Sequence, residues 1–362
     1  KSPVEWIEEE SYFFRLSKWE KPLLEYYEAN PDFIAPRSRK NEVISFVKSG
    51  LKDLSVSRKS FSWGIPVPNN KNHVIYVWLD ALTNYLSALN YPNTNDDLFK
   101  KFWPASIHLI GKDILRFHAV YWPAFLLAAK IDLPKRVYGH GWILSGEEKM
   151  SKSKGNILDP LEIIKEYGLD PLRYYLIKEV SFGNDGNISQ ERLEDCINSD
   201  LANNYGNLCQ RVTTFAIKNC NGKIPLEVKF HDEDLLILNK YKDNLDNIRS
   251  QIDNQNINFY IDYIVNSLFE ANKYFNDQEP WKKKDDKIRL NTIVYTTLEI
   301  VRKISFLLYP IIPESSLKAL KIFDIEEKDV KLDTVSNNEY LTKGNNIHKI
   351  DILFKKIEKQ ND

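Results

Sequence analysis

A polar, lysine-rich stretch at residues 148–156 divides this 362-residue chain into two halves with different sequence patterns. It contains three lysines and two serines, followed by a glycine and an asparagine. Such a composition is too polar for a core and too rich in serine and glycine for a stable helix. We therefore predict an exposed, positively charged loop suited to a polyphosphate ligand. A solvated lysine-rich turn is the simpler alternative.

The residues after this loop predict two successive helices. Asp159 can cap a helix N-terminus, and Pro160 fits the first helical position. Gly168 then predicts the end of that helix, and Asp170–Pro171 predicts the start of the next one. The loop would therefore lie next to a helix N-terminus, which is a favourable place for a phosphate group.

The half before the loop alternates between strand-like and helix-like segments. Residues 74–79 and 107–110 are apolar runs typical of strands that are buried on both faces. Helical patterns follow at 80–89 and 114–129, and an extended run at 137–144 leads into the loop. This alternation predicts βαβ units in a doubly wound parallel sheet. Ligands of such sheets bind beyond the carboxyl ends of the strands.

Aromatic and acidic residues gather at these strand ends. Asp113 and Phe117 are four residues apart, as are Ile114 and His118, so each pair shares one face of the predicted helix. Trp78 lies near the end of the predicted strand at 74–79. An aromatic wall with one carboxylate suits a small amino acid with a hydrophobic side chain. Helix capping by the acids and core packing by the aromatics are the alternatives.

The half after the loop has a helical pattern, with a charged and partly exposed tail from Glu326. Short connections between the helices predict an antiparallel bundle. The predicted helices cover about 190–220, 232–254, 257–277, 285–308 and 312–323.

Two features of the predicted bundle suit single-stranded RNA. Asn203, Asn207 and Arg211 follow one another at intervals of four residues and predict one polar stripe. Trp281 directly precedes the lysines at 282–284. Amide and guanidinium groups can bond to the edges of unstacked bases, and an aromatic ring can stack on them. A solvated helix face is the alternative for the stripe.

The composition limits which partners and which cellular compartment the protein can have. Lys+Arg (50) and Asp+Glu (51) nearly balance, so a nucleic acid would have to meet a local basic patch. Without an apolar run of 18 residues or a signal-like start, we expect no membrane span. The three cysteines lack C-x-x-C spacing and predict free, buried thiols in a reducing compartment. Since Met150 is the only methionine and residue 1 is lysine, we expect a fragment of a longer protein.

Four motifs occur together in a characteristic order. They are YVWLDALTNY at 76–85, HLIGKDILRFH at 108–118, GHGWIL at 139–144 and KMSKS at 149–153. With this combination the chain resembles the methionyl-tRNA synthetases, a family of class I aminoacyl-tRNA synthetases. The similarity extends from about Pro3 to the last helices.

The resemblance implies an α/β part followed by an all-α part. The first would be the C-terminal half of a Rossmann-like, parallel-sheet catalytic domain, and the second an antiparallel helical anticodon-binding bundle. Residues 1–35 would end an inserted connective domain, and 36–145 would form the catalytic half. Residues 146–188 would hold the KMSKS loop and the stem-contact region, and 189–362 would bind the anticodon.

The resemblance also implies individual roles. Lys149 and Lys152 would be catalytic, because they would stabilise the transition state at the triphosphate. The implied ATP-binding residues are Gly111, Trp142, Ile143, Lys149, Ser151, Lys152 and Ser153. The implied methionine-binding residues are Trp78, Ala81, Tyr85, Asp113, Ile114, Phe117 and His118. The implied anticodon-binding residues are Asn207, Arg211 and Trp281.

The implied activity is that of a cytoplasmic methionine–tRNA ligase. With ATP and Mg²⁺ it would convert L-methionine to methionyl-adenylate and transfer it to the 3′ end of tRNA(Met). The sequence lacks the H-x-G-H signature of class I synthetases and offers no zinc site. We therefore expect the signature in a preceding segment, and we expect the fragment alone to be inactive.

Two other functions are compatible with part of the sequence. One is a non-catalytic, tRNA-binding piece. The other is a class I synthetase of the leucyl, isoleucyl or valyl type, against which Trp78, Tyr85, His118 and the surroundings of Trp281 argue.

Overall fold

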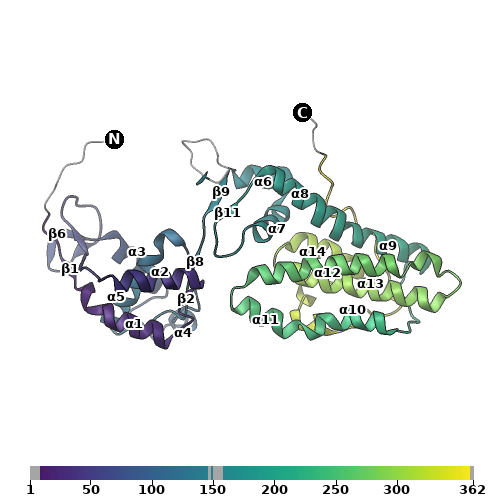
Figure 1. The fold of residues 1–362 in the computed structure, drawn as a ribbon, viewed down its shortest axis with the longest axis horizontal. Helices are drawn as coiled ribbons and strands as arrows, with labels where there is room; N and C mark the ends of the chain where they lie inside the picture. Colours follow the sequence, from purple (N-terminus) through teal and green to yellow (C-terminus); the bar gives the residue numbers. More distant parts are fainter. Residues whose placement is uncertain (1–8, 146–147, 150–157, 359–362) are drawn as a thin grey trace. The chain divides into compact units, whose positions relative to one another are not determined.

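The computed structural model describes residues 9–145, 148–149 and 158–358. The chain divides into two compact units, residues 1–142 and residues 143–362 (Figure 1). In the first, strands and helices alternate, and the second is mainly helical. This division supports the predicted change of architecture near the lysine-rich stretch.

A three-stranded parallel sheet lies in the first unit, with the order β2-β8-β7. The strands are β2 (Ile34–Ala35), β7 (His108–Gly111) and β8 (Val137–His140). Helix α5 (Trp122–Ala129) connects β7 to β8, which confirms the predicted βαβ unit in this segment. Helices α1 (Glu20–Ala29) and α2 (Arg37–Lys48) contribute apolar side chains to the same core as this sheet.

The strand predicted at 74–79 is wrong in its extent and in its sheet. Strand β6 (Asn70–Ile75) pairs antiparallel with β4 (Ser57–Arg58) and β5 (Pro66–Val67). Helix α3 (Val77–Ser87) begins where the predicted strand would still continue. An apolar run without turn residues fits a strand or a buried helix equally well. Here Leu82 and Leu86, four residues apart, are buried on one helix face.

The remaining elements of the first unit are short. Strand β1 (Phe13–Phe14) pairs with β3 (Leu54–Ser55). Helix η1 (Leu16–Trp19) precedes α1, and α4 (Asp97–Phe102) lies between α3 and β7 along the chain.

The helix predicted at 114–129 is present, but its winding changes along its length. It begins as the 3₁₀ turn η2 (Lys112–Ile114), passes through the π-helical segment η3 (Phe117–Tyr121) and ends as α5. A π turn holds one more residue than an α turn, so it rotates the following side chains about the helix axis. His118 lies in this segment.

The second unit begins with a small sheet that the sequence did not predict. Strand β9 (Ile143–Ser145) pairs antiparallel with β10 (Glu148–Lys149) and parallel with β11 (Gly186–Asn187). Helices α6 (Pro160–Tyr167) and α7 (Leu169–Glu179) follow as predicted.

The caps of these two helices differ in one respect from the prediction. Asp159 caps α6 by accepting a hydrogen bond from the Leu161 N–H at 2.8 Å. Gly168 ends α6 with a φ of 95°, which favours glycine. Asp170 does not cap α7, since it lies within the first turn and accepts a bond from the Ser315 N–H at 2.6 Å.

All the helical segments predicted after residue 190 are present. The first consists of α8 (Gln190–Cys196), the π-helical η5 (Ile197–Gly206) and α9 (Asn207–Asn219), and the second is interrupted at Asn244. The others are α10 (Asp232–Asp243), α11 (Leu245–Asp253), α12 (Ile257–Asp277), η6 (Pro280–Lys282), α13 (Lys287–Leu308), α14 (Pro313–Leu320) and η7 (Lys321–Phe323).

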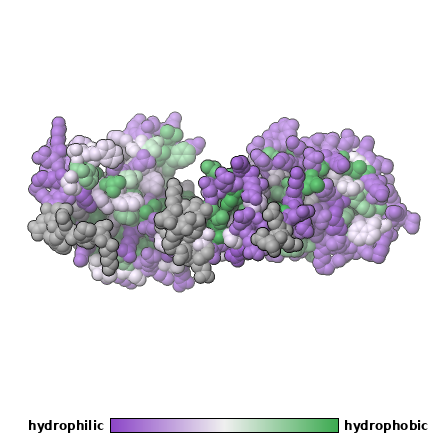
Figure 2. Space-filling view, turned by 90° about the horizontal axis from the view of Figure 1, so that it is seen from above, coloured by the Kyte–Doolittle hydropathy of each residue, from purple (hydrophilic) through white to green (hydrophobic). Residues whose placement is uncertain are grey.

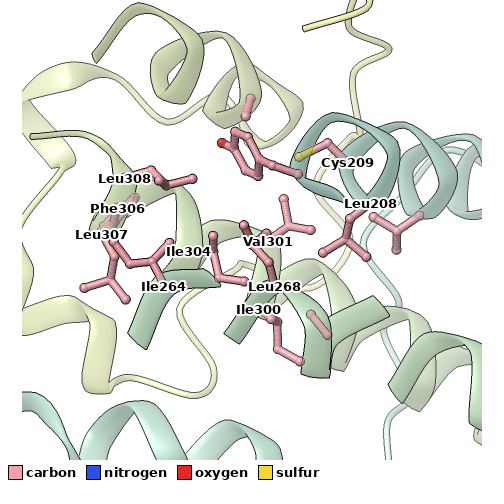
Figure 3. Close-up of a cluster of buried hydrophobic side chains, with 14 of the residues drawn as sticks. Leu208, Cys209, Ile264, Leu268, Ile300, Val301, Ile304, Phe306, Leu307 and Leu308 are labelled. Carbon is pink, nitrogen blue, oxygen red and sulfur yellow. The ribbon is translucent and has the colours of Figure 1, made fainter. Parts of the chain in front are cut away.

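The bundle encloses a continuous apolar core. Leu208 and Cys209 from α9 meet Leu268 from α12 and Val301 and Ile304 from α13 (Figure 3). The face shown in Figure 2 is mostly hydrophilic over the helical unit, with small hydrophobic areas between. This pattern is typical of a helix bundle that buries one face of each helix.

The tail after Glu326 is more buried than predicted. It forms the 3₁₀ turns η8 (Glu327–Asp329) and η9 (Leu332–Ser336), and Val335 and Leu341 are buried in the bundle core. Its charged residues are mainly exposed, as expected.

The sequence predicted free, buried cysteines and no membrane-spanning helix. All three cysteines are free; Cys196 and Cys209 are buried, and Cys220 is half-buried. Within the described ranges, no helix has the length and hydrophobicity needed to cross a bilayer.

Candidate functional site

Four of the predicted pocket residues form one aromatic cluster in the first unit. The rings of Trp78 and Phe117 stack with their centroids 3.8 Å apart, and Trp78 also meets the edge of His118 at 6.3 Å. The Tyr85 hydroxyl lies 2.9 Å from His118 Nε2. Helix α3 supplies Trp78 and Tyr85, while η3 supplies the other two residues. Four of the seven residues predicted to bind methionine therefore lie together in the structure.

The contacts of His118 define its protonation state. Its Nδ1 lies 3.1 Å from the Ile114 carbonyl oxygen, which can only accept a hydrogen bond, so Nδ1 carries the proton. Burial lowers the pKa of His118, so the ring is neutral and Nε2 is an acceptor. Tyr85 must then donate its hydroxyl proton to Nε2, and burial raises the pKa of Tyr85. Tyr85 and His118 therefore form an uncharged, hydrogen-bonded side of the cluster.

Lys112 and Asp113, in the 3₁₀ turn η2, contact the side chain of Trp142. Trp142 Nε1 donates to Asp113 Oδ1 at 3.2 Å, and the Lys112 ammonium lies 4.1 Å from the Trp142 ring centroid. A Cβ added to Gly111 would lie 2.7 Å from Asp113 Oδ1, so a larger residue would displace the carboxylate. Asp113 was predicted to bind an amino acid, and Trp142 and Gly111 to bind ATP. The structure thus places a predicted amino-acid-binding residue in contact with a predicted ATP-binding residue.

The aromatic cluster includes residues that the sequence analysis did not single out. His108 packs edge-on against Tyr85 with ring centroids 4.1 Å apart, and Trp122 lies 6.3 Å from the same ring. Burial, followed by the nearby His118, lowers the pKa of His108 to about 4. Trp122 lies four residues after His118, and this spacing could have indicated it.

The other predicted residues of this region differ in their surroundings. Ala81 has an exposed side chain on α3, and Ile114 contributes its carbonyl oxygen to His118. Ile143 belongs to the second unit and is 39% exposed. The backbone of Lys149 pairs with Leu144 in the small sheet. The predicted residues Ser151, Lys152 and Ser153 lie outside the described residues.

The predicted RNA-binding residues lie at one region of the helical unit. Asn207 is exposed at the start of α9, and Arg211 lies one turn later. Trp281 is 39% exposed in η6 and meets Phe275 edge-to-face, with ring centroids 6.1 Å apart. The Arg211 guanidinium carbon lies 5.5 Å from the centroid of the same Phe275 ring. Arg211 and Trp281 therefore lie against one shared aromatic residue.

Phe275 and Asn276 were missed by the sequence analysis. Asn276 Oδ1 accepts a hydrogen bond from Arg211 at 2.6 Å, and Phe275 separates Arg211 from Trp281. Both residues lie near the end of α12, where they resemble ordinary helix residues. No local pattern distinguishes them, because their importance comes from a contact with a distant helix.

No group of three or more His, Cys, Asp and Glu side chains within the described ranges is arranged to hold a metal ion.

Two family models match the chain. The model of class I tRNA synthetases (M) matches residues 1–213, and that of the anticodon binding domain of methionyl tRNA ligase matches residues 224–362. The chain belongs to the methionyl-tRNA synthetase family. This confirms the resemblance derived from the four motifs, and with it the predicted fold class.

Individual relatives agree with this family. The chain is 51% identical to the methionine–tRNA ligase of Brucella suis biovar 1 (strain 1330), in a match covering 90% of the chain and 63% of that protein. It is 49% identical to the enzyme of Rickettsia felis (strain ATCC VR-1525 / URRWXCal2), covering 99% and 70%. The chain therefore spans less than two thirds of the Brucella protein.

A solved structure in the family shows the same fold. Mycobacterium tuberculosis methionyl-tRNA synthetase in complex with methionyl-adenylate superposes with a TM-score of 0.93 at 46% identity. The match covers 98% of this chain and 70% of that one.

Proposed function

We propose that the protein to which this chain belongs is a methionine–tRNA ligase. It would activate L-methionine with ATP to methionyl-adenylate and transfer the methionyl group to the 3′ end of tRNA(Met), in the cytoplasm. The aromatic cluster of Trp78, Tyr85, Phe117 and His118 is the observation that carries this proposal. In a chain of this family, such a cluster, with Asp113 four residues before Phe117, suits an amino acid with an apolar side chain.

The methionine side chain would pack against the cluster. Trp78 and Phe117 would supply apolar area, and the neutral pair of Tyr85 and His118 would offer no charge to the thioether. Asp113 would face the substrate ammonium, since a carboxylate can bond to it with charge assistance. Ala81 and Ile114 would complete the pocket.

ATP would bind beside this pocket. Gly111, Trp142 and Ile143 would contact the nucleotide, and Ser151 and Ser153 would add hydroxyl donors. Lys149 and Lys152 would neutralise the triphosphate as the methionine carboxylate attacks the α-phosphorus and pyrophosphate leaves. Such transfers depend on positioning and on charge stabilisation. Mg²⁺ would arrive with the triphosphate, whose oxygens it prefers.

The domain roles would follow the predicted boundaries. Residues 1–35 would end the inserted domain, 36–145 would form part of the catalytic domain, and 146–188 would contact the tRNA stem. Residues 189–362 would bind the anticodon, where Asn207, Arg211 and Trp281 would contact the CAU bases. The shared contact of Arg211 and Trp281 with Phe275 supports this assignment, because it groups donors and a stacking surface.

Methionine-dependent exchange of pyrophosphate into ATP tests the proposal. The intact protein should catalyse exchange, and Trp78→Ala should raise the KM for methionine about 10- to 100-fold, as expected for about 1.5–3 kcal/mol of lost apolar contact. Exchange that responds to leucine, isoleucine or valine instead would favour another class I synthetase. Binding of tRNA without any exchange would favour a non-catalytic RNA-binding protein.

A further inference from the structure

A buried arginine closes the base of the loop that carries Trp281. This loop joins α12 to α13, which lie side by side in the bundle (Figure 1). Arg289, in the first turn of α13, is 7% exposed. Its Nη2 atom donates to Gln278 Oε1 at 2.5 Å, across 11 positions of the chain. The two ends of the loop are therefore joined by side chains as well as by the helices.

Asp234 from a third helix holds this arginine in place. The guanidinium donates through Nη1 to Asp234 Oδ2 at 2.6 Å and through Nη2 to Asp234 Oδ1 at 3.0 Å. Asp234 is fully buried and also accepts bonds from the His231 N–H, at 2.8 Å, and from the Tyr274 hydroxyl. A two-pronged bond between guanidinium and carboxylate fixes orientation as well as distance. The ends of α10, α12 and α13 are thereby fixed around one loop.

The same loop base supports the RNA-binding residues. Gln278 is the C-cap residue of α12 and lies two positions after Asn276. Phe275 contacts Trp281, and Asn276 contacts Arg211. Movement of the loop base would change the separation between the indole and the guanidinium. Recognition of bases by stacking and hydrogen bonding depends on that separation.

We propose that Arg289 and Asp234 are positioning residues for the RNA-binding site formed by Asn207, Arg211 and Trp281. They hold the loop in its binding geometry before RNA arrives, so that the loop loses less conformational entropy on binding. This inference rests on the proposed anticodon-binding function. If the pair only stabilised the bundle, its loss would lower stability without changing the affinity of the folded protein.

The test compares the affinity of the intact protein for a fluorescent RNA hairpin with a CAU loop. Arg289→Lys keeps the charge but loses the fork, and it should weaken binding about 2- to 10-fold, the cost of ordering one long side chain. Gln278→Ala should have a similar effect, because it opens the loop base and leaves the ion pair. Arg302→Lys is the matched control, since Arg302 is buried on the same helix and pairs with Glu299 at 2.8 Å. It should lower stability but leave affinity unchanged.

A double-mutant cycle with Trp281→Ala separates positioning from a general effect. If Arg289 acts through Trp281, Arg289→Lys should cost little further affinity once the indole is absent. Unchanged affinity in Arg289→Lys and Gln278→Ala, or losses that simply add to that of Trp281→Ala, would overturn the inference alone. Unchanged affinity in Trp281→Ala would contradict the anticodon-binding proposal and the inference together.

Discussion

At the scale of single residues, two histidines make the first unit sensitive to acid. Burial lowers the pKa of His108, whose usual value is 6.5, to about 4, and it also lowers the pKa of His118. Protonation of His118 at Nε2 would reverse its bond with Tyr85, whose oxygen would then accept, and would place a positive charge in the aromatic cluster. Burial of the two rings therefore favours the neutral form of both.

Acid should destabilise this unit over a defined pH range. Below pH 6.5 the unfolded chain gains a proton on His108 that the folded state does not bind until about pH 4. The free energy of unfolding should thus fall between pH 6.5 and 4, by on the order of 3 kcal/mol for this group. Urea unfolding followed by tryptophan fluorescence measures it, with His108→Gln as the comparison. An equally steep pH dependence in that variant would contradict the assignment.

Trp281 should contribute a large share of the RNA affinity. Its indole is 39% exposed and lies nearly perpendicular to the Phe275 ring, so part of it is accessible for stacking on a base. We expect Trp281→Ala to weaken binding of a CAU anticodon stem-loop by about 1–3 kcal/mol, the range for a lost base stack. Fluorescence anisotropy with a labelled stem-loop gives the affinity. Trp281→Phe, which keeps an aromatic face, should retain part of it.

At the scale of elements, the long helices could be predicted and the short strands could not. Helices such as α12 and α13 repeat an apolar face over many turns, so their periodicity is unambiguous. Strands β2 and β11 contain two residues each, and long-range pairing alone defines them. The π-helical segments η3 and η5 likewise leave no local signal. The site residues Phe275 and Arg289 escaped prediction for the same reason, since distant contacts determine their role.

Helix α13 binds the C-terminal segment through several buried side chains, one of which is a lysine. Lys303 Nζ donates to the carbonyl oxygens of Val335, at 2.5 Å, and Asn337, at 2.8 Å, and to Asn338 Oδ1 at 3.0 Å. Lys303→Met should leave the Val335 carbonyl and Asn338 Oδ1 without this donor, while the Asn337 carbonyl keeps its bond from Arg302 Nη2 at 2.8 Å. We expect the free energy of unfolding to fall by about 1–3 kcal/mol. Urea denaturation followed by circular dichroism at 222 nm measures the loss.

A less deeply buried lysine in the same region provides the comparison. The side chain of Lys343 is half-buried and pairs with Glu339 at 2.8 Å. Lys343→Met should change stability by about 0.5 kcal/mol or less. Equal losses in the two variants would show that the buried bonds of Lys303 add no stability.

At the scale of the whole molecule, the two units have separate cores. Among residues 9–145 and 158–358, the apolar clusters of the first unit and the cluster of the helical bundle have no residue in common. Trp281 is the only one of the eight tryptophans that follows residue 142. Tryptophan fluorescence therefore reports mainly on the first unit, whereas the circular dichroism signal of the helices comes mainly from the second.

These probes should resolve two unfolding transitions. Residues without shared contacts affect stability independently, so a substitution in one core should not shift the unfolding of the other. We expect Lys303→Met to move the midpoint seen by circular dichroism and to leave the fluorescence midpoint unchanged, while His108→Gln should do the reverse. Midpoints that coincide and move together in both variants would instead show that the chain unfolds as one cooperative unit.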